Sequence, residues 1–182
     1  NDLNYRRIYP DGFSAGSIEI QSLTSNGIEF ANQLIEVNYK PLPPKTLYSM
    51  ELEKEIASGE KRKLTFKTIL NVPEKFGSFG YYRDRLTMSG GWTPYLASYR
   101  NGSFHPTDQS PRADWNVTIV SDDKVIVGGE VNDAGSTAFQ RKNIGQFPIQ
   151  IGKHLKVEET KVNGLKMLTV VDERKSEMSS SR

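Results

Sequence analysis

The chain has 182 residues, 36% of them hydrophobic, and its 24 basic and 22 acidic residues leave a formal net charge of +2 at pH 7. This length suffices for one domain, or two small ones, with a substantial core. The near balance of charge argues against DNA or an anionic membrane surface as a partner. The absence of cysteine excludes disulfides, thiolate metal ligands and thiol nucleophiles.

The sequence contains no segment that is apolar for long enough to span a membrane. Its longest apolar runs, such as Val125–Val127, are far shorter than the roughly 18 residues that a spanning helix needs. The first residues, Asn1–Arg7, are polar and do not form a secretion signal. We therefore expect no membrane segment in this chain. The compartment stays open, with a periplasmic, cell-surface or secreted location favoured over the cytoplasm.

Apolar residues recur at every second position along much of the chain. The alternation is visible at 18–20, 64–70, 115–120 and 168–170. A period of two places one face of a strand in a core and the other face toward water. These four segments are therefore predicted to be strands.

The stretch from Ser49 to Lys63 has the composition of a helix but not its spacing. Met50, Leu52 and Ile56 share one parity, which favours a strand with a charged outer face. A short surface helix is the alternative for the same residues.

Glycine-containing turns separate the apolar stretches. Asn26-Gly27, Asn101-Gly102 and Asn163-Gly164 are strong turn dipeptides because both residue types tolerate positive φ angles. Asp133–Gly135 and Pro10–Gly12 are further turn candidates.

Several short strands without βαβ alternation predict an all-β protein, and specifically an antiparallel β-sandwich. We expect a single domain over residues 1–171. The serine-rich, charged stretch over 172–182 is expected to be a polar tail or linker, because it cannot bury enough apolar surface to offset the entropy of ordering.

The residues offer no recognisable catalytic machinery. The two histidines, His105 and His154, are too far apart for the His-Glu-x-x-His pattern of a zinc peptidase helix. His105 and Asp108 are too few for a catalytic zinc site, which needs three protein ligands, and a solvated loop histidine is the simpler interpretation. We therefore expect that this chain is not an enzyme, with no catalytic residue, no metal ligand and no cofactor of its own.

A compact basic cluster is formed by Lys61, Arg62 and Lys63. No row of aromatic residues accompanies it to stack on bases. A solvated turn is the expected role, and nucleic acid is not expected as a partner.

Aromatic residues gather in the glycine-rich stretch between positions 76 and 99. Some of these rings must pack in a core. A stretch so often broken by glycine is also a plausible place for rings to emerge at an interface, where Tyr and Trp are over-represented. Both interpretations stay open.

Short motifs in a fixed order resemble those of a known family. They are the Tyr-Arg-Arg-Ile-Tyr-Pro run at 5–10, Gly-x-Ile-x-Ile-x-Ser-Leu at 16–23, the strand ending in Pro43, Phe-Gly-Tyr at 79–81 followed by Gly-Trp-Thr-Pro at 91–94, Pro-x-x-Ala-Asp-Trp-x-Val-x-Ile at 111–119, and the strands from Phe147 to Leu165. Together they resemble the N-terminal β-sandwich domain of the M1 (gluzincin) aminopeptidases and their bacterial relatives, over nearly the whole chain.

The resemblance implies a non-catalytic domain that packs on the catalytic domain of the same polypeptide and helps shape its substrate cleft. The family's zinc helix and its Gly-x-Met-Glu-Asn loop cannot be placed on this sequence, so zinc is expected only in that absent domain. The chain is accordingly expected to be a piece of a longer protein, lacking the family's first strands. Trp92, Tyr95 and His105 are the expected interface or substrate-cleft residues.

Two other functions remain open. The chain could be a stand-alone cell-surface or carbohydrate-binding β-sandwich module, with its aromatic residues stacked on sugar rings. It could also form an edge-strand homodimer, if Leu3–Tyr9 is a strand whose outer edge is left unpaired.

Overall fold

The structure is a computed structural model that describes residues 2–30, 34–40, 42–52, 54–107 and 111–174. These residues belong to two compact units. Unit 1 comprises Asn1–Ala15, Val72–Tyr95 and Gln109–Arg182, and unit 2 comprises Gly16–Asn71 and Leu96–Asp108. The single domain over 1–171 stays a prediction, and most of the tail over 172–182 lies outside the described residues.

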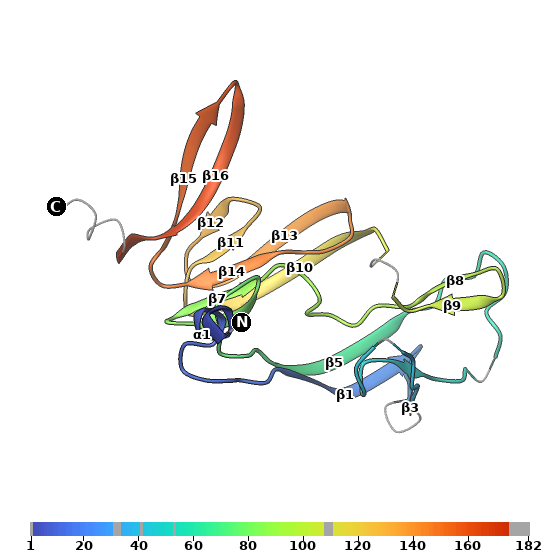
Figure 1. The fold of residues 1–182 in the computed structure, drawn as a ribbon. Coiled ribbons are helices and arrows are strands. Elements are labelled where there is room, and N and C mark those ends of the chain that lie inside the picture. The colour runs from blue at the N-terminus through green and yellow to red at the C-terminus, as the bar shows by residue number, and fades with distance from the viewer. Residues whose placement is uncertain (1, 31–33, 41, 53, 108–110, 175–182) are drawn as a thin grey trace, which may run out of the picture. The chain divides into compact units, whose positions relative to one another are not determined.

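Unit 1 is built on a five-stranded sheet (Figure 1). Its neighbouring strands are all antiparallel, in the order β12-β11-β14-β7-β6. The bounds are β6 Phe79–Tyr82, β7 Arg85–Met88, β11 Val125–Val127, β12 Glu130–Asn132 and β14 Ile149–Gly152. All three residues of β11 are buried, as expected for a strand inside a sheet that packs on both faces.

Two long antiparallel ladders also belong to unit 1. One joins β10 (Ala113–Ser121) to β13 (Gly135–Ile144), and the other is the hairpin of β15 (Leu155–Val162) and β16 (Leu165–Asp172). In β10 the odd positions from Trp115 to Ile119 are half-buried and the even positions are exposed, which confirms the alternation predicted from the sequence.

The core of unit 1 consists of buried hydrophobic side chains from five strands and one loop. They are Met88, Val125, Ile126, Val127, Phe139, Phe147, Ile149 and Leu155. Phe147 lies just before β14, so its ring joins the sheet to the β10–β13 ladder through contacts with Trp115 and Phe139.

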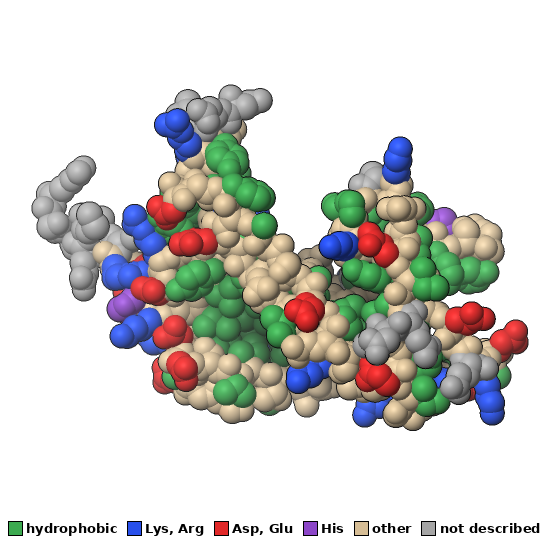
Figure 2. All heavy atoms as spheres, turned by 90° about the horizontal axis from the view of Figure 1, so that it is seen from below, with side chains coloured by type: hydrophobic (Ala, Val, Ile, Leu, Met, Phe, Trp, Pro, Cys, Tyr) green, Lys and Arg blue, Asp and Glu red, His purple; other side chains and the backbone are tan. Residues whose placement is uncertain are grey.

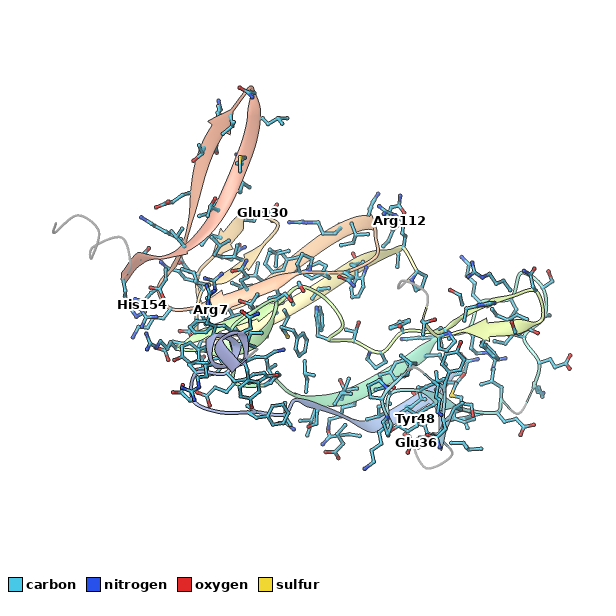
Figure 3. All side chains as sticks on the ribbon, viewed as in Figure 1. Arg7, Glu36, Tyr48, Arg112, Glu130 and His154 are labelled. Carbon is cyan, nitrogen blue, oxygen red and sulfur yellow. The ribbon has the colours of Figure 1, made fainter. Side chains whose placement is uncertain are left out.

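Unit 2 is a set of small antiparallel sheets. The largest has the order β2-β1-β5, with β1 at Ser17–Ser25, β2 at Ile28–Glu29 and β5 at Leu64–Asn71. The others are two-stranded: β3 (Ile35–Glu36) pairs with β4 (Tyr48–Ser49), and β8 (Ser98–Arg100) pairs with β9 (Ser103–His105). Glu36 and Tyr48, which face each other across β3 and β4, are labelled in Figure 3.

A β-bulge changes which side chains of β1 turn inward. The register of β1 against β5 shifts between Ile20 and Ser22. Because an extra residue in one strand reverses the parity beyond it, the alternation of Ile18 and Ile20 does not continue, and the buried residues are Leu23 and Ser25.

Four of the five predicted turns are confirmed; at the fifth, Asp133–Gly135, the chain bends between β12 and β13, and Gly135 already belongs to β13. Asn26-Gly27, Asn101-Gly102 and Asn163-Gly164 each join two paired strands, with both residues at positive φ. The turn at Pro10–Gly12 is closed by a hydrogen bond from the Gly12 amide to the Tyr9 carbonyl. The all-β, antiparallel class is likewise confirmed, while the packing of two sheets into a sandwich stays a prediction.

The predicted strand at Leu3–Tyr9 is wrong, because Asp2–Ile8 forms the short helix α1. Arg6 and Arg7 stand in its last turn, where cations interact favourably with the helix dipole. The Tyr9 amide donates to the Tyr5 carbonyl, and the rings of the same two residues lie 5.3 Å apart. The edge-strand dimer expected from this segment therefore has no strand to form it.

The stretch from 50 to 63 is neither the predicted strand nor the alternative helix in its described residues. Residues 57–60 instead form a turn, in which the Glu60 amide donates to the Ala57 carbonyl and the Glu60 side chain accepts from the Ala57 amide at 3.0 Å. Gly59 has a φ of +80°, a conformation that interrupts either regular element.

Candidate functional site

The β8–β9 hairpin of unit 2 is the candidate site. Asn101 and Gly102 occupy its two-residue turn with φ angles of 50° and 78°, as a type I′ hairpin turn requires. The turn fixes the register, which places Tyr99 opposite Phe104.

The two faces of this hairpin differ in character. Residues directly opposite each other in an antiparallel pair lie on the same face. Tyr99 and Phe104 therefore form an aromatic face, and the pairs Ser98–His105 and Arg100–Ser103 form a polar face.

The aromatic face is open to solvent. Tyr99 is 64% exposed and Phe104 is 67% exposed, and their ring centroids lie 4.8 Å apart at an interplanar angle of 58°. The two rings hold each other in a tilted arrangement, which is favourable for an aromatic pair. Most of their apolar surface nevertheless remains in contact with water.

His105 lies on the polar face and is half-buried. Its Nε2 is 3.3 Å from the hydroxyl oxygen of Ser103. A serine beside a histidine is the first part of a nucleophilic arrangement, but a base needs a third group that orients it. No such group contacts His105 in the bonds described for this unit, so the pair is a local contact between neighbours on one strand.

Trp92 belongs to unit 1 and has a packing role there. Its indole Nε1 donates to the Phe147 carbonyl at 2.7 Å, and its ring centroid lies 6.1 Å from that of Trp115 and 6.4 Å from that of Phe147. Trp115 makes an equivalent bond to the Ile144 carbonyl at 3.1 Å. These contacts tie the loop around Trp92 to β10 and to the loop before β14.

The three residues expected from the sequence are divided between the two units. Trp92 and Tyr95 lie in unit 1, whereas His105 lies in unit 2. Tyr95 is half exposed. Their predicted role beside a catalytic domain stays a prediction.

The residues that sequence reasoning did not select are Tyr99 and Phe104. The signal was present, because Asn101-Gly102 is a two-residue turn and counting outward from it pairs position 99 with position 104. This count places the two aromatic residues on one face of the hairpin.

A group of charged residues lies at the base of the β15–β16 hairpin. Arg174 donates to both carboxylate oxygens of Asp172, at 3.0 and 2.7 Å, and its Nη1 lies 3.6 Å from a carboxylate oxygen of Asp84. The hydrogen bonds from Arg174 lower the pKa of Asp172 to about 2. His154, labelled in Figure 3, lies in the turn before β15, where its carbonyl accepts from the Glu173 amide at 2.8 Å.

Within the residues that the structure describes, no three His, Asp or Glu side chains gather in a way that could hold a metal ion. In the same residues, no helix is both long and apolar enough to cross a membrane.

Comparisons with protein families, with curated proteins and with solved structures find no match for this chain.

Proposed function

We propose that this chain acts by binding a protein surface rather than by catalysis, and that the aromatic face of the β8–β9 hairpin is its contact. The observation that carries the proposal is the exposure of Tyr99 and Phe104 on one face of the β8–β9 hairpin. Aromatic side chains are concentrated at the buried centres of interfaces and account for much of the binding energy there.

The arrangement of the aromatic rings also favours a protein partner over a sugar. A sugar ring stacks on a flat aromatic surface, whereas Tyr99 and Phe104 are inclined at 58° to each other. Trp92, the other natural platform, is occupied by its contacts with Trp115 and Phe147. A glycan-binding module is therefore the second candidate.

The specific form of the proposal follows from the family resemblance. The partner would be the catalytic domain of an M1-like zinc aminopeptidase in the same polypeptide, with zinc held in that domain. The chain would then be an accessory domain that packs beside the substrate cleft.

The first test is the reading frame that follows Arg182. If the partner is an M1-like peptidase domain, the downstream sequence should contain His-Glu-x-x-His. A downstream sequence without this motif would contradict the peptidase hypothesis. The downstream domain, expressed separately, should bind this chain in a titration calorimeter.

The second test concerns the hairpin itself. The double variant Tyr99→Ser/Phe104→Ser should weaken that binding by at least about tenfold, because it truncates both members of an aromatic contact. The matched control is Ser98→Ala/His105→Ala, which alters the polar face and should change the affinity little. Equal affinities for the chain and the aromatic variant would refute the contact, and glycan binding that the aromatic variant loses would favour the second candidate.

A further inference from the structure

The β15–β16 hairpin of unit 1 forms a two-stranded sheet of its own, so in the described residues neither of its outer edges pairs with another strand. In the described residues β16 pairs only with β15, and β15 approaches β12 without pairing with it. The outer edge of β16 therefore presents backbone donors and acceptors that no neighbouring strand takes up. Such an edge is a template for pairing with another strand.

Apolar side chains accompany this free edge. Leu165 is 72% exposed and Met167 is 52% exposed, and Val162 and Leu168 are exposed as well. Figure 2 shows hydrophobic side chains at the surface of the molecule. Neither a proline nor a bulge interrupts the register from Leu165 to Asp172, and Lys166 is the one basic residue of this strand.

The charges on β16 and around it differ between its two ends. Near the hairpin tip, Lys166 pairs with Glu159 at 2.7 Å and faces Lys161 across the ladder, so these three residues have a net charge of +1. At the base, Asp172 and Asp84 both contact Arg174, and these three have a net charge of −1. An antiparallel approach of two such strands brings opposite charges together.

We propose that β16 pairs with β16 of a second copy of this chain, antiparallel and centred on Thr169. In this register Lys166 of each copy lies opposite Asp172 of the other, Met167 lies opposite Val171, and Leu168 lies opposite Val170. The two-fold axis of this dimer is perpendicular to the sheet, so a given residue has its side chain on the same face in both copies. Paired residues are both even-numbered or both odd-numbered, and their side chains therefore lie on one face.

The charges favour the register centred on Thr169 over the one centred on Leu168. If the pairing is centred on Leu168 instead, Lys166 faces Val170 and Asp172 faces Gly164, so no opposite charges meet. Opposite charges in directly facing positions stabilise a strand pair, and the two-fold axis supplies two such pairs. The proposal does not depend on the β8–β9 hairpin or on any catalytic domain, and the edge is not the one expected at Leu3–Tyr9.

The register can be tested with single cysteines, because the chain has none of its own. Facing residues in an antiparallel pair have Cα atoms about 4.5–5.5 Å apart, which is within the range of a disulfide. Under oxidised glutathione, Thr169→Cys should give a covalent dimer as its main product. Leu168→Cys would form the disulfide if the pairing were centred on Leu168 instead. Thr160→Cys, on β15, measures disulfides that form by random collision. Both variants should give little covalent dimer.

The charge argument can be tested by sedimentation velocity over a concentration series. A pairing of two short strands buries less than the roughly 1,000 Å² of a stable interface, so the series should extend to high concentration. Lys166→Glu should raise the dimer dissociation constant by about tenfold, since it replaces two attractive pairs with two repulsive ones. Lys161→Glu makes the same change of charge on β15 and should have a much smaller effect.

The result expected is a dimer that Thr169→Cys traps and Lys166→Glu weakens. A chain that stays monomeric throughout the series would overturn the proposal, and so would a dimer linked best through Leu168→Cys. Equal linking of all three cysteine variants would overturn it as well. Circular dichroism of each variant establishes that a lost dimer is not a lost fold.

Discussion

The two units differ in how much apolar surface they bury. Of the buried hydrophobic residues that the structure describes, eight lie in unit 1, whereas Leu23 and Phe30 are the two in unit 2. Unit 2 nevertheless exposes many large hydrophobic side chains, among them Ile35, Leu96 and Phe104. Unit 1 therefore has the larger core of its own, and we propose that exposed apolar residues of unit 2 contact a partner.

The difference has a local origin in the strands. The five-stranded sheet of unit 1 receives Phe139 and Phe147 from outside its strands, and these rings cover it. The hairpins β3–β4 and β8–β9 of unit 2 are two or three residues long in each strand. An isolated two-stranded hairpin is marginally stable in water. Contacts with a partner would therefore add more to the stability of these hairpins than to that of the five-stranded sheet.

The largest effect is expected for Phe147→Ala in unit 1. The ring is fully buried and contacts Trp92, Trp115 and Phe139. Its removal should lower the free energy of unfolding by about 3–5 kcal/mol. Both tryptophans of the chain lie in unit 1, so urea unfolding followed by tryptophan fluorescence measures this loss, and a loss below about 1 kcal/mol would contradict the role given to the ring.

The counterpart in unit 2 is Phe30→Ala. Phe30 is buried and its amide donates to the Leu23 carbonyl at 2.7 Å. Removing one of the two buried hydrophobic residues described for unit 2 should unfold this unit, at a local loss of about 3 kcal/mol. Far-UV circular dichroism should lose strand signal while the tryptophan midpoint stays unchanged. A matching shift of the tryptophan midpoint would show that the two units do not unfold separately.

The smallest effect on the free energy of unfolding is expected when the pH is lowered. The pKa of Asp172 is lowered to about 2 from an ordinary value of 3.8, so this carboxylate stabilises the folded state above pH 4. That contribution is lost as the pH falls from about 4 to about 2. Because Arg174 is exposed, we expect a loss of only about 0.5–1 kcal/mol.

The acid effect has its own control variant. Asp172→Asn removes the ionisable group, so the difference in unfolding free energy between the two proteins should shrink on acidification. Urea titrations at pH 6 and pH 2.5 measure it. A difference that grows at low pH would contradict the pairing of Asp172 with Arg174.

The sequence predicts the local features of the fold well. Each Asn-Gly dipeptide forms its expected turn, and the alternation around Trp115 predicts the two faces of β10, because both signals act between near neighbours. The register of Tyr99 and Phe104 follows from one of these turns. The aromatic face of the candidate site could therefore be derived, although its exposure could not.

Features that depend on distant residues escaped prediction. The strand order that places β14 between β11 and β7 joins segments far apart in the chain. The bulge after Ile20 reverses a parity that the sequence alone continues. The contacts that place Trp92 among packed rings come from Trp115 and Phe147, so its packing role could not be read from the residues around it.

We infer that unit 1 is stabilised by its own core, whereas unit 2 has a small core and is less stable without a partner. Native-state hydrogen exchange on the full chain tests this inference most directly. Amides of β7, β11 and β14 should exchange only through complete unfolding of unit 1. Amides of β1, β5, β8 and β9 should exchange through openings of lower free energy. Equal or stronger protection of the strands of unit 2 in the isolated chain would contradict the account.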